Sequence, residues 1–318
     1  MPQPVLIDTD PGIDDALALL LAFRSAEWRV EAVTTVAGNV PVEVGTANVA
    51  RILGVARPAH PPVVATGAAG PLSRPLVIAT HVHGEDGLGG LAALRGADGG
   101  PCFPEVPLVR HPGDAADLLI ELARRWRDSL TVVTLGPLTN LALAVERDLE
   151  ALRGVGAIVT MGGSVAEGGN VTAAAEYNVF VDPEAAARVL AAGLPLTLVP
   201  LDVTHRVRWS ASRVERLARA ADPVARFAHA LARASGGGGI IMHDPLAVGV
   251  ALDPSLVEAP ALPVAVETAG AFTLGATVVD RRRRPPARAG WGSCRVALRV
   301  DAARFLDLYE ARVCPACA

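Results

Sequence analysis

Four aspartates fall within eight residues near the start of the chain, at Asp8, Asp10, Asp14 and Asp15. The surrounding residues predict a buried strand at 5–7, a Pro-Gly turn at 11–12 and an apolar helix at 16–23. The four carboxylates therefore gather at the C-terminal end of a strand and the N-terminus of a helix, where open α/β folds place their sites.

This much negative charge at one point repels itself unless something positive binds there. Helix capping explains Asp14 and Asp15, because carboxylates in the first helical turn interact favourably with the helix dipole, by about 0.3–1 kcal/mol each. Capping does not explain Asp8 and Asp10, which the Pro-Gly turn brings to the same place. Because hard cations prefer carboxylate oxygens, the cluster favours a Ca²⁺ or Mg²⁺ site.

Strand-like and helix-like segments alternate along the chain, which is typical of βαβ units around a mainly parallel sheet. We predict one α/β domain over residues 1–312, with an open, Rossmann-like sheet flanked by helices, and a short tail at 313–318. We expect the Gly/Pro-rich stretch 58–112 to form loops over the sheet. The predicted strands are 30–36, 130–135, 156–160 and 194–201, and the predicted helices are 42–53, 138–145 and 183–192.

Composition excludes several classes of function. The net charge of −4 offers no bulk attraction to nucleic acid. The apolar runs are far shorter than the ~20 residues of a membrane span, and no basic leader precedes the first strand, so we expect a cytoplasmic protein.

All 29 basic residues are arginine, which excludes any mechanism that needs a lysine. We expect Arg281–Arg284 to form a solvated loop and the Cys314/Cys317 pair to lie in a frayed tail.

Further polar residues follow the other predicted strands, at the edge that carries the aspartates. Asn39 follows one strand, Asn140 follows another, and a third is followed by a run that reaches Glu176 and Asn178. His243 and Asp244 open a late helix. Amides and carboxylates hold the hydroxyls of a sugar, a bound cation can hold two more, and His243 or His83 could donate a proton.

The motifs that carry these residues resemble, in order and spacing, those of the inosine–uridine nucleoside hydrolases over nearly the whole chain. The matching segments are Asp8-Thr-Asp-Pro-Gly-Ile-Asp-Asp15, Ala37-Gly-Asn39, His83-Gly-Glu-Asp-Gly-Leu88, Leu135-Gly-Pro-Leu-Thr-Asn140, Met161-Gly-Gly163, Glu176-Tyr-Asn178, His243-Asp-Pro245 and Gly275-Ala-Thr-Val-Val-Asp280. The resemblance implies calcium-dependent hydrolysis of ribonucleosides by a homodimer or homotetramer.

The resemblance also implies a role for each site residue. Asp10 would be the general base on a calcium-held water, His243 the leaving-group acid, and Asp8 a residue that orients the turn. Calcium would be held by Asp10, Asp15, the backbone carbonyl of Leu135 and Asp244. The ribose 2′ and 3′ hydroxyls would be bound by Asp14, Asn39, Asn178 and Asp244. The 5′ hydroxyl would be bound by Asn170 and Glu176. Met161 would lie near the ribose, and His83 would contact the base.

Two other interpretations stay open at this point. Asp8 and Asp10 after a strand also suggest a haloacid-dehalogenase-type phosphatase, although that mechanism usually needs a lysine to restrain the phosphate. A non-catalytic module that binds calcium and ribose would keep the same ligands. The segment before His243 contains Gly236–Gly239 and no aromatic base contact, so we expect a mobile loop there that closes over the base; purine and pyrimidine both stay possible.

Overall fold

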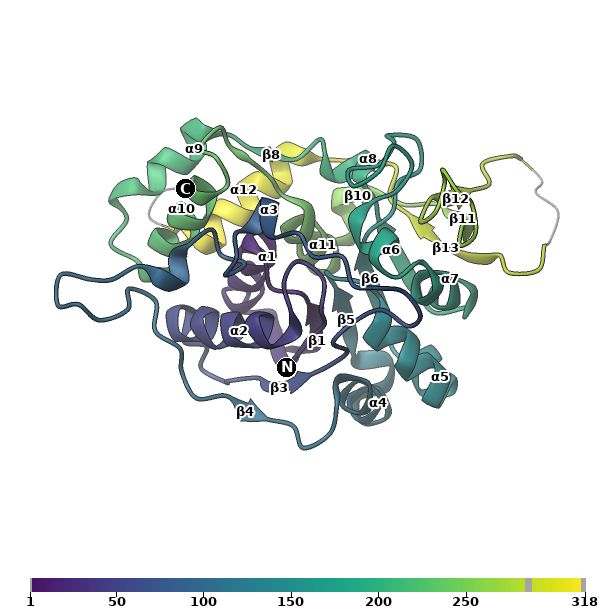
Figure 1. The fold of residues 1–318 in the computed structure, drawn as a ribbon, viewed down its shortest axis with the longest axis horizontal. Coiled ribbons are helices and arrows are strands. Elements are labelled where there is room, and N and C mark those ends of the chain that lie inside the picture. Colours follow the sequence, from purple (N-terminus) through teal and green to yellow (C-terminus); the bar gives the residue numbers. More distant parts are fainter. Residues whose placement is uncertain (1, 284–287, 316–318) are drawn as a thin grey trace.

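The computed structural model describes residues 2–283 and 288–315. Its main feature is a ten-stranded sheet in the order β12-β11-β13-β7-β6-β5-β1-β2-β3-β4 (Figure 1). The strands of this sheet are β1 (Gln3–Thr9), β2 (Trp28–Thr35), β3 (Val63–Thr66), β4 (Val109–Arg110), β5 (Thr131–Thr134), β6 (Ala157–Met161), β7 (Leu196–Val199), β11 (Ala261–Val266), β12 (Thr277–Val279) and β13 (Gly292–Val296). Two short antiparallel pairs join β8 (Arg208–Trp209) to β9 (Ile240–Ile241) and β10 (Val257–Glu258) to β14 (Arg299–Val300).

Eight neighbouring strands of the sheet run parallel, in the order β4, β3, β2, β1, β5, β6, β7 and β13. Strands β11 and β12 are added at one edge by antiparallel pairing. The chain begins at β1 in the middle, extends the sheet to one side through β2, β3 and β4, and then returns to the other side through β5, β6 and β7. The order therefore reverses between β1 and β5, and such a switch point opens a crevice at the carboxyl ends of the strands. The predicted α/β fold with a mainly parallel sheet is confirmed.

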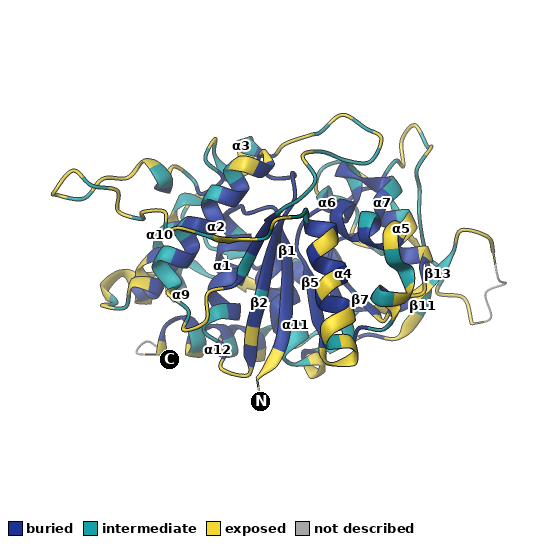
Figure 2. Ribbon diagram, turned by 90° about the horizontal axis from the view of Figure 1, so that it is seen from below, coloured by how far each residue is buried: buried dark blue, intermediate teal, exposed yellow. Residues whose placement is uncertain are grey.

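Helices cover both faces of the sheet, and the buried strands β1, β2 and β5 lie between the two layers (Figure 2). One hydrophobic cluster packs beneath α1, α2, α10, α11 and α12, and the other beneath α4, α5 and α7. The α-helices are α1 (Ile13–Phe23), α2 (Val42–Ala56), α3 (Thr80–His83), α4 (Ala115–Trp126), α5 (Thr139–Arg153), α6 (Tyr177–Val181), α7 (Pro183–Ala191), α8 (Leu201–Thr204), α9 (Ala211–Glu215), α10 (Pro223–Ala234), α11 (His243–Leu252) and α12 (Ala302–Val313).

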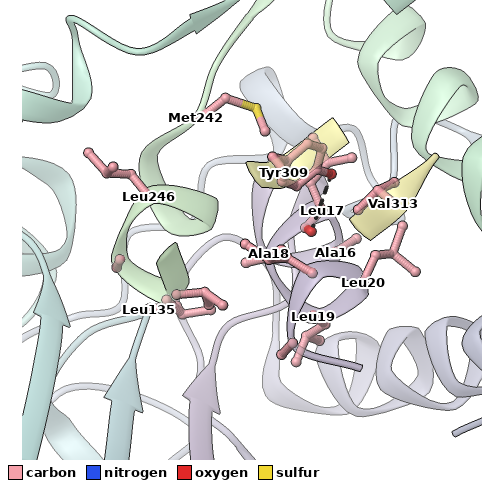
Figure 3. Packing of buried hydrophobic residues seen from close by; sticks show 14 of the residues in the cluster. Ala16, Leu17, Ala18, Leu19, Leu20, Leu135, Met242, Leu246, Tyr309 and Val313 are labelled. Atoms are coloured by element: carbon pink, nitrogen blue, oxygen red, sulfur yellow. Dashed lines mark hydrogen bonds between the residues drawn. The ribbon is translucent and has the colours of Figure 1, made fainter. Parts of the chain in front are cut away.

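Helix α1 is the centre of the first cluster. Its residues from Ala16 to Ala22 are all buried, and Figure 3 shows Tyr309 of α12 next to Leu17 of this stretch. Leu246 of α11 belongs to the same cluster. The Tyr309 hydroxyl donates to the carbonyl of Leu17 at 3.4 Å. The helix begins at Ile13 rather than at residue 16, because Asp15 accepts the Gly12 N–H at 2.9 Å and so caps an earlier turn.

The structure corrects several predicted boundaries. Stretch 58–112 is more than loops: it contributes β3, an interior strand between β2 and β4, and the strand β4 itself. The predicted helix 138–145 extends to Arg153 across a kink at Asp148, and the predicted strand 194–201 is reduced to β7. Helix α12 ends one residue beyond the predicted domain boundary. Cys314 is buried after it, and Cys317 and Arg284 lie outside the described residues.

Among residues 2–283 and 288–315, no helix is both long and apolar enough to cross a membrane.

Candidate active site

A cavity of about 560 Å³ opens at the carboxyl ends of the parallel strands, next to the switch point between β1 and β5. A volume of this order suits a drug-sized ligand. Every residue that the sequence analysis assigned to a site lines this cavity except Asp10 and Asp15, which lie just beneath the lining. The lining residues from that set are Asp14, Asn39, His83, Leu135, Met161, Asn170, Glu176, Asn178, His243 and Asp244.

Asp10 is almost fully buried, and only part of its carboxylate has a partner in the protein. Its Oδ2 accepts the backbone N–H of Asn39 at 2.7 Å, whereas its Oδ1 has no hydrogen-bond partner among the described residues. Two glycines enclose the group: a Cβ added at Gly38 would lie 2.1 Å from Oδ2, and one added at Gly136 would lie 2.6 Å from Oδ1. Burying a carboxylate oxygen without a partner costs free energy, so we expect this atom to bind a ligand.

The remaining carboxylates of the cluster converge beside Asp10. Asp15 accepts from the Thr9 hydroxyl and, at 3.0 Å, from the Asn39 side-chain amide, so Asn39 links Asp15 to Asp10. One oxygen from each of Asp14, Asp15 and Asp244 lies within 4.8 Å of the others. Asp14, which we had assigned to the ribose alone, therefore also lies within reach of any cation held by its neighbours.

Burial and the repulsion between neighbouring carboxylates raise the pKa of two groups in this cluster, Asp10 and Asp244. Burial raises the pKa of Asp10 well above its ordinary value, and the charge of Asp15 raises it further. Burial likewise raises the pKa of Asp244, and Asp14 and Asp15 add to the effect. Because a hard divalent cation takes carboxylate and carbonyl oxygens as ligands and would cancel this repulsion, the donor set fits Ca²⁺ or Mg²⁺.

Asp8 belongs to the same sequence motif but not to the cavity. Its Oδ1 accepts from the Thr34 hydroxyl and from the side-chain amide of Asn140, at 2.5 and 2.8 Å. Asn140 also donates to the carbonyl of Thr35 and accepts the N–H of Ala68. Asp8 therefore ties the ends of β1 and β2 to the start of α5. Its role in orienting the Pro-Gly turn stays a prediction.

On the wall formed by β6 and α6, amide and carboxylate groups are fixed by the backbone. The Asn178 side-chain amide donates to the carbonyl of Leu135 at 2.6 Å and to that of Met161 at 3.3 Å. Asn170 accepts the backbone N–H of Tyr177 at 2.9 Å. These contacts set the orientation of the Asn178 and Asn170 side chains before a substrate arrives.

Glu176 accepts three backbone N–H groups, from Gly163, Asn178 and Val179, at 2.9–3.1 Å. Its burial nevertheless raises its pKa to about 7, from an ordinary value of 4.5. Between these two pH values the native state holds a proton that the unfolded chain releases. The Glu176 contribution to stability is therefore full below about pH 4.5 and is lost as the pH rises through about 7.

Glu176→Gln should remove that dependence on pH. We expect the stability of the wild type relative to this variant to fall between pH 4.5 and 7.5, by on the order of 3 kcal/mol. Chemical denaturation of the two metal-free proteins at a series of pH values measures this difference. A constant difference across the range would contradict the assignment of the titration to Glu176.

The histidines lie at the opposite wall. His83 Nδ1 accepts the backbone N–H of Ile13 at 3.1 Å; because that N–H can only donate, neutral His83 carries its proton on Nε2. His243 Nδ1 pairs with the Thr204 hydroxyl at 2.8 Å, and its ring meets that of His205 edge-on at 5.5 Å. Burial, with His205 and His83, lowers the pKa of His243 to about 3, so it is a neutral imidazole near pH 7.

The outer wall holds residues to which sequence analysis assigned no role. His81, Arg208 and the strand β9 line the cavity there, and the Arg208 guanidinium donates to the carbonyl of Gly238 at 2.8 Å. The Gly236–Gly239 segment leads into β9, which pairs with β8. Arg208 thus adds a charged group to the wall beside the Gly236–Gly239 segment. It comes from a distant segment, and no motif in the sequence marks it.

Comparison with known proteins identifies this arrangement. The family described as inosine-uridine preferring nucleoside hydrolase matches residues 5–307. The chain belongs to this family. As a nucleoside hydrolase it is 41% identical, over 88% of its length and 90% of the relative's, to a pyrimidine-specific ribonucleoside hydrolase RihA of Photobacterium profundum. It is 37% identical to the RihA protein of Salmonella gallinarum, over 98% of this chain and 99% of that one.

Solved nucleoside hydrolase structures share the fold. The plant nucleoside hydrolase PpNRh1 superimposes with a TM-score of 0.87 at 33% identity, covering 98% of this chain and 99% of that one. The purine-preferring ribonucleoside hydrolase of Gardnerella vaginalis gives a TM-score of 0.88 at 28% identity and covers 99% of both chains. The resemblance stated from the sequence motifs is confirmed.

Proposed function

We propose that this nucleoside hydrolase is calcium-dependent and cleaves the N-glycosidic bond of free ribonucleosides, releasing base and ribose. The observation that carries the proposal is the unpaired, buried Oδ1 of Asp10 among three more carboxylates, directly beneath a cavity of about 560 Å³. In this proposal the Ca²⁺ ligands are Asp10, Asp15, Asp244 and the carbonyl of Leu135. When bound, the cation lowers the pKa of a coordinated water and balances the carboxylate charge.

The protein groups would act on a positively charged transition state. Breaking an N-ribosidic bond develops oxocarbenium-like charge on the ribose, which nearby buried carboxylates stabilise. Asp10 accepts a proton from the water that attacks the anomeric carbon. As the N-glycosidic bond breaks, the departing base takes a proton from solvent water, and His243, whose Nδ1 is held by Thr204, donates a hydrogen bond to it. The burial that lowers the pKa of His243 to about 3 tells against its expected role as the leaving-group acid.

Substrate positioning is proposed to follow the walls of the cavity. His83 presents its Nε2–H to the base, and the Met161 side chain packs near the ribose. The ribose hydroxyls are bound by Asp14, Asn39, Asn178 and Asp244 at the 2′ and 3′ positions, and by Asn170 and Glu176 at the 5′ position. The cytoplasmic location stays a prediction from the sequence, and the homodimeric or homotetrameric assembly stays a prediction from the resemblance.

The two other interpretations lose support. Asp8, the nucleophile of the phosphatase hypothesis, is fully buried against Thr34 and Asn140 and does not line the cavity. The family and the relatives described above are named as hydrolases, which supports an enzyme over a purely binding module. Those relatives include both pyrimidine-specific and purine-preferring enzymes, so the substrate test has to include both classes of base.

Purified protein should release free base and ribose from at least one member of a panel of uridine, cytidine, inosine and adenosine. Chelation should lower the rate at least about 100-fold, and added Ca²⁺ should restore it, because the cation activates the attacking water. The 2′-deoxynucleosides should react at least about tenfold more slowly, since they lack one bound hydroxyl. The proposal is falsified if calcium-loaded protein cleaves no ribonucleoside, and the metal assignment fails if chelated protein keeps its activity.

A further inference from the structure

Tyr177 lies between two residues assigned to the ribose, but its hydroxyl reaches elsewhere. Its Oη lies 2.7 Å from the carbonyl oxygen of Gly38 and 2.8 Å from that of Val77. One hydroxyl has one proton, so the two carbonyls share it. Burial and the charges of Asp10 and Glu176 raise the pKa of Tyr177 far above its ordinary value, so this group stays a donor at any working pH.

The first carbonyl, that of Gly38, belongs to the Gly38–Asn39 peptide, whose N–H donates to the Asp10 carboxylate. The C=O of Gly38 and the N–H of Asn39 are the two ends of one planar peptide unit. Tyr177 donates to the C=O end, and the N–H end donates to Asp10 Oδ2 at 2.7 Å. The tyrosine hydroxyl therefore fixes the plane of the group that orients the Asp10 carboxylate, and serial hydrogen bonds of this kind strengthen one another.

The second carbonyl belongs to the segment at the mouth of the cavity, residues 77–83. Ala79, His81, Val82 and His83 of this segment line the cavity. Of its apolar side chains, Val77 is 43% exposed and Val82 is 59% exposed, whereas Ala79 is buried. Hydrogen bonds join the segment to its surroundings: Tyr177 to Val77, the N–H of Ala79 to the carbonyl of Asn39 at 3.1 Å, the N–H of Ile13 to His83, and the N–H of Gly89 to the carbonyl of His83 at 2.8 Å.

We propose that the Tyr177 hydroxyl is a positioning group that ties the mouth segment 77–83 to the Gly38–Asn39 peptide, and through that peptide to Asp10. The same atom then sets both the shape of the substrate entrance and the orientation of the general base. This inference rests on the proposed function for its kinetic consequences, but the tether itself is independent of the reaction catalysed.

Tyr177→Phe keeps the ring and removes only the hydroxyl. Loss of the hydrogen bond that the two carbonyls share should raise KM and lower kcat, each by about three- to tenfold. Amide hydrogen exchange in residues 77–84 should become at least about threefold faster. The chain contains one other tyrosine, Tyr309, whose hydroxyl makes a single long bond to Leu17 in the core, away from the cavity (Figure 3). Tyr309→Phe is therefore the matched control, and it should leave both quantities within twofold of the wild type.

The proposal is supported if Tyr177→Phe alone changes exchange in residues 77–84 and changes kcat and KM together. It is overturned if exchange in that segment is unchanged, if kcat/KM stays within twofold, or if Tyr309→Phe has the same effect. Failure of the proposed function gives a different result: the wild type itself cleaves no nucleoside, while the exchange experiment still reports whether the tether exists.

Discussion

Asp10→Asn should lower kcat on ribonucleosides by about 10²–10⁴-fold, the range typical of a lost general base. The amide oxygen of asparagine can still accept the N–H of Asn39, so the backbone around it should hold. The same substitution removes a buried negative charge that raises the pKa of Asp244. We therefore expect the metal-free variant to be at least as stable to heat as the metal-free wild type.

Steady-state kinetics and thermal unfolding of both proteins measure the two effects. Asp128→Asn, on the exposed surface, is the matched control and should change neither. A kcat within tenfold of the wild type would exclude Asp10 as the base. A large loss of stability in the absence of metal would show instead that Asp10 has a structural role.

Gly38→Ala should lower kcat/KM by at least about 100-fold, which is the scale of loss caused by displacing a catalytic group by about 1 Å. The new Cβ would lie 2.1 Å from Asp10 Oδ2 and 2.9 Å from its Cγ, distances that no real packing allows. Either the Asp10 carboxylate rotates or the Gly38–Asn39 peptide moves, and in both cases the hydrogen bond from Asn39 is lost. Gly38→Ala therefore displaces the proposed general base, Asp10, without removing its carboxylate.

Gly70→Ala is the control for that experiment. A Cβ at Gly70 meets no atom within 4 Å, so it adds the same methyl group where there is space. We expect its kcat/KM to stay within twofold of the wild type. Equal losses in the two variants would mean that a general loosening of the loops, and not the contact with Asp10, lowers activity.

The site residues that could be predicted from the sequence are those that lie within short motifs. The run from Asp8 to Asp15 predicted its own location because a strand, a turn and a helix surround it. Asn39, Glu176 and Asn178 were found in the same way, since each follows a strand whose carboxyl end meets the switch point. Their roles in binding and catalysis stay predictions until the experiments above are done.

The groups that sequence analysis missed act through contacts between distant segments. Arg208 reaches the cavity only because β8 pairs with β9, and two-residue strands leave no periodic signal. Tyr177 was visible inside a motif, but nothing in its neighbours indicated that its hydroxyl meets Gly38 and Val77. Strand β3 was missed because glycine and proline around it are typical of loops, although parallel pairing on both sides makes it an interior strand.

The position of β1 has a consequence for how this protein is made. The strand that leads to Asp10 precedes its neighbour β5 in the chain, and the groups proposed to share its cation include Asp244 at the start of α11, far along the sequence. The proposed ion site is therefore incomplete until β5 and α11 have joined β1. Calcium bound in this way would stabilise only a chain in which these segments have docked. Occupancy of the site would then report that docking, and a variant cut before α11 would lose activity and ion binding together.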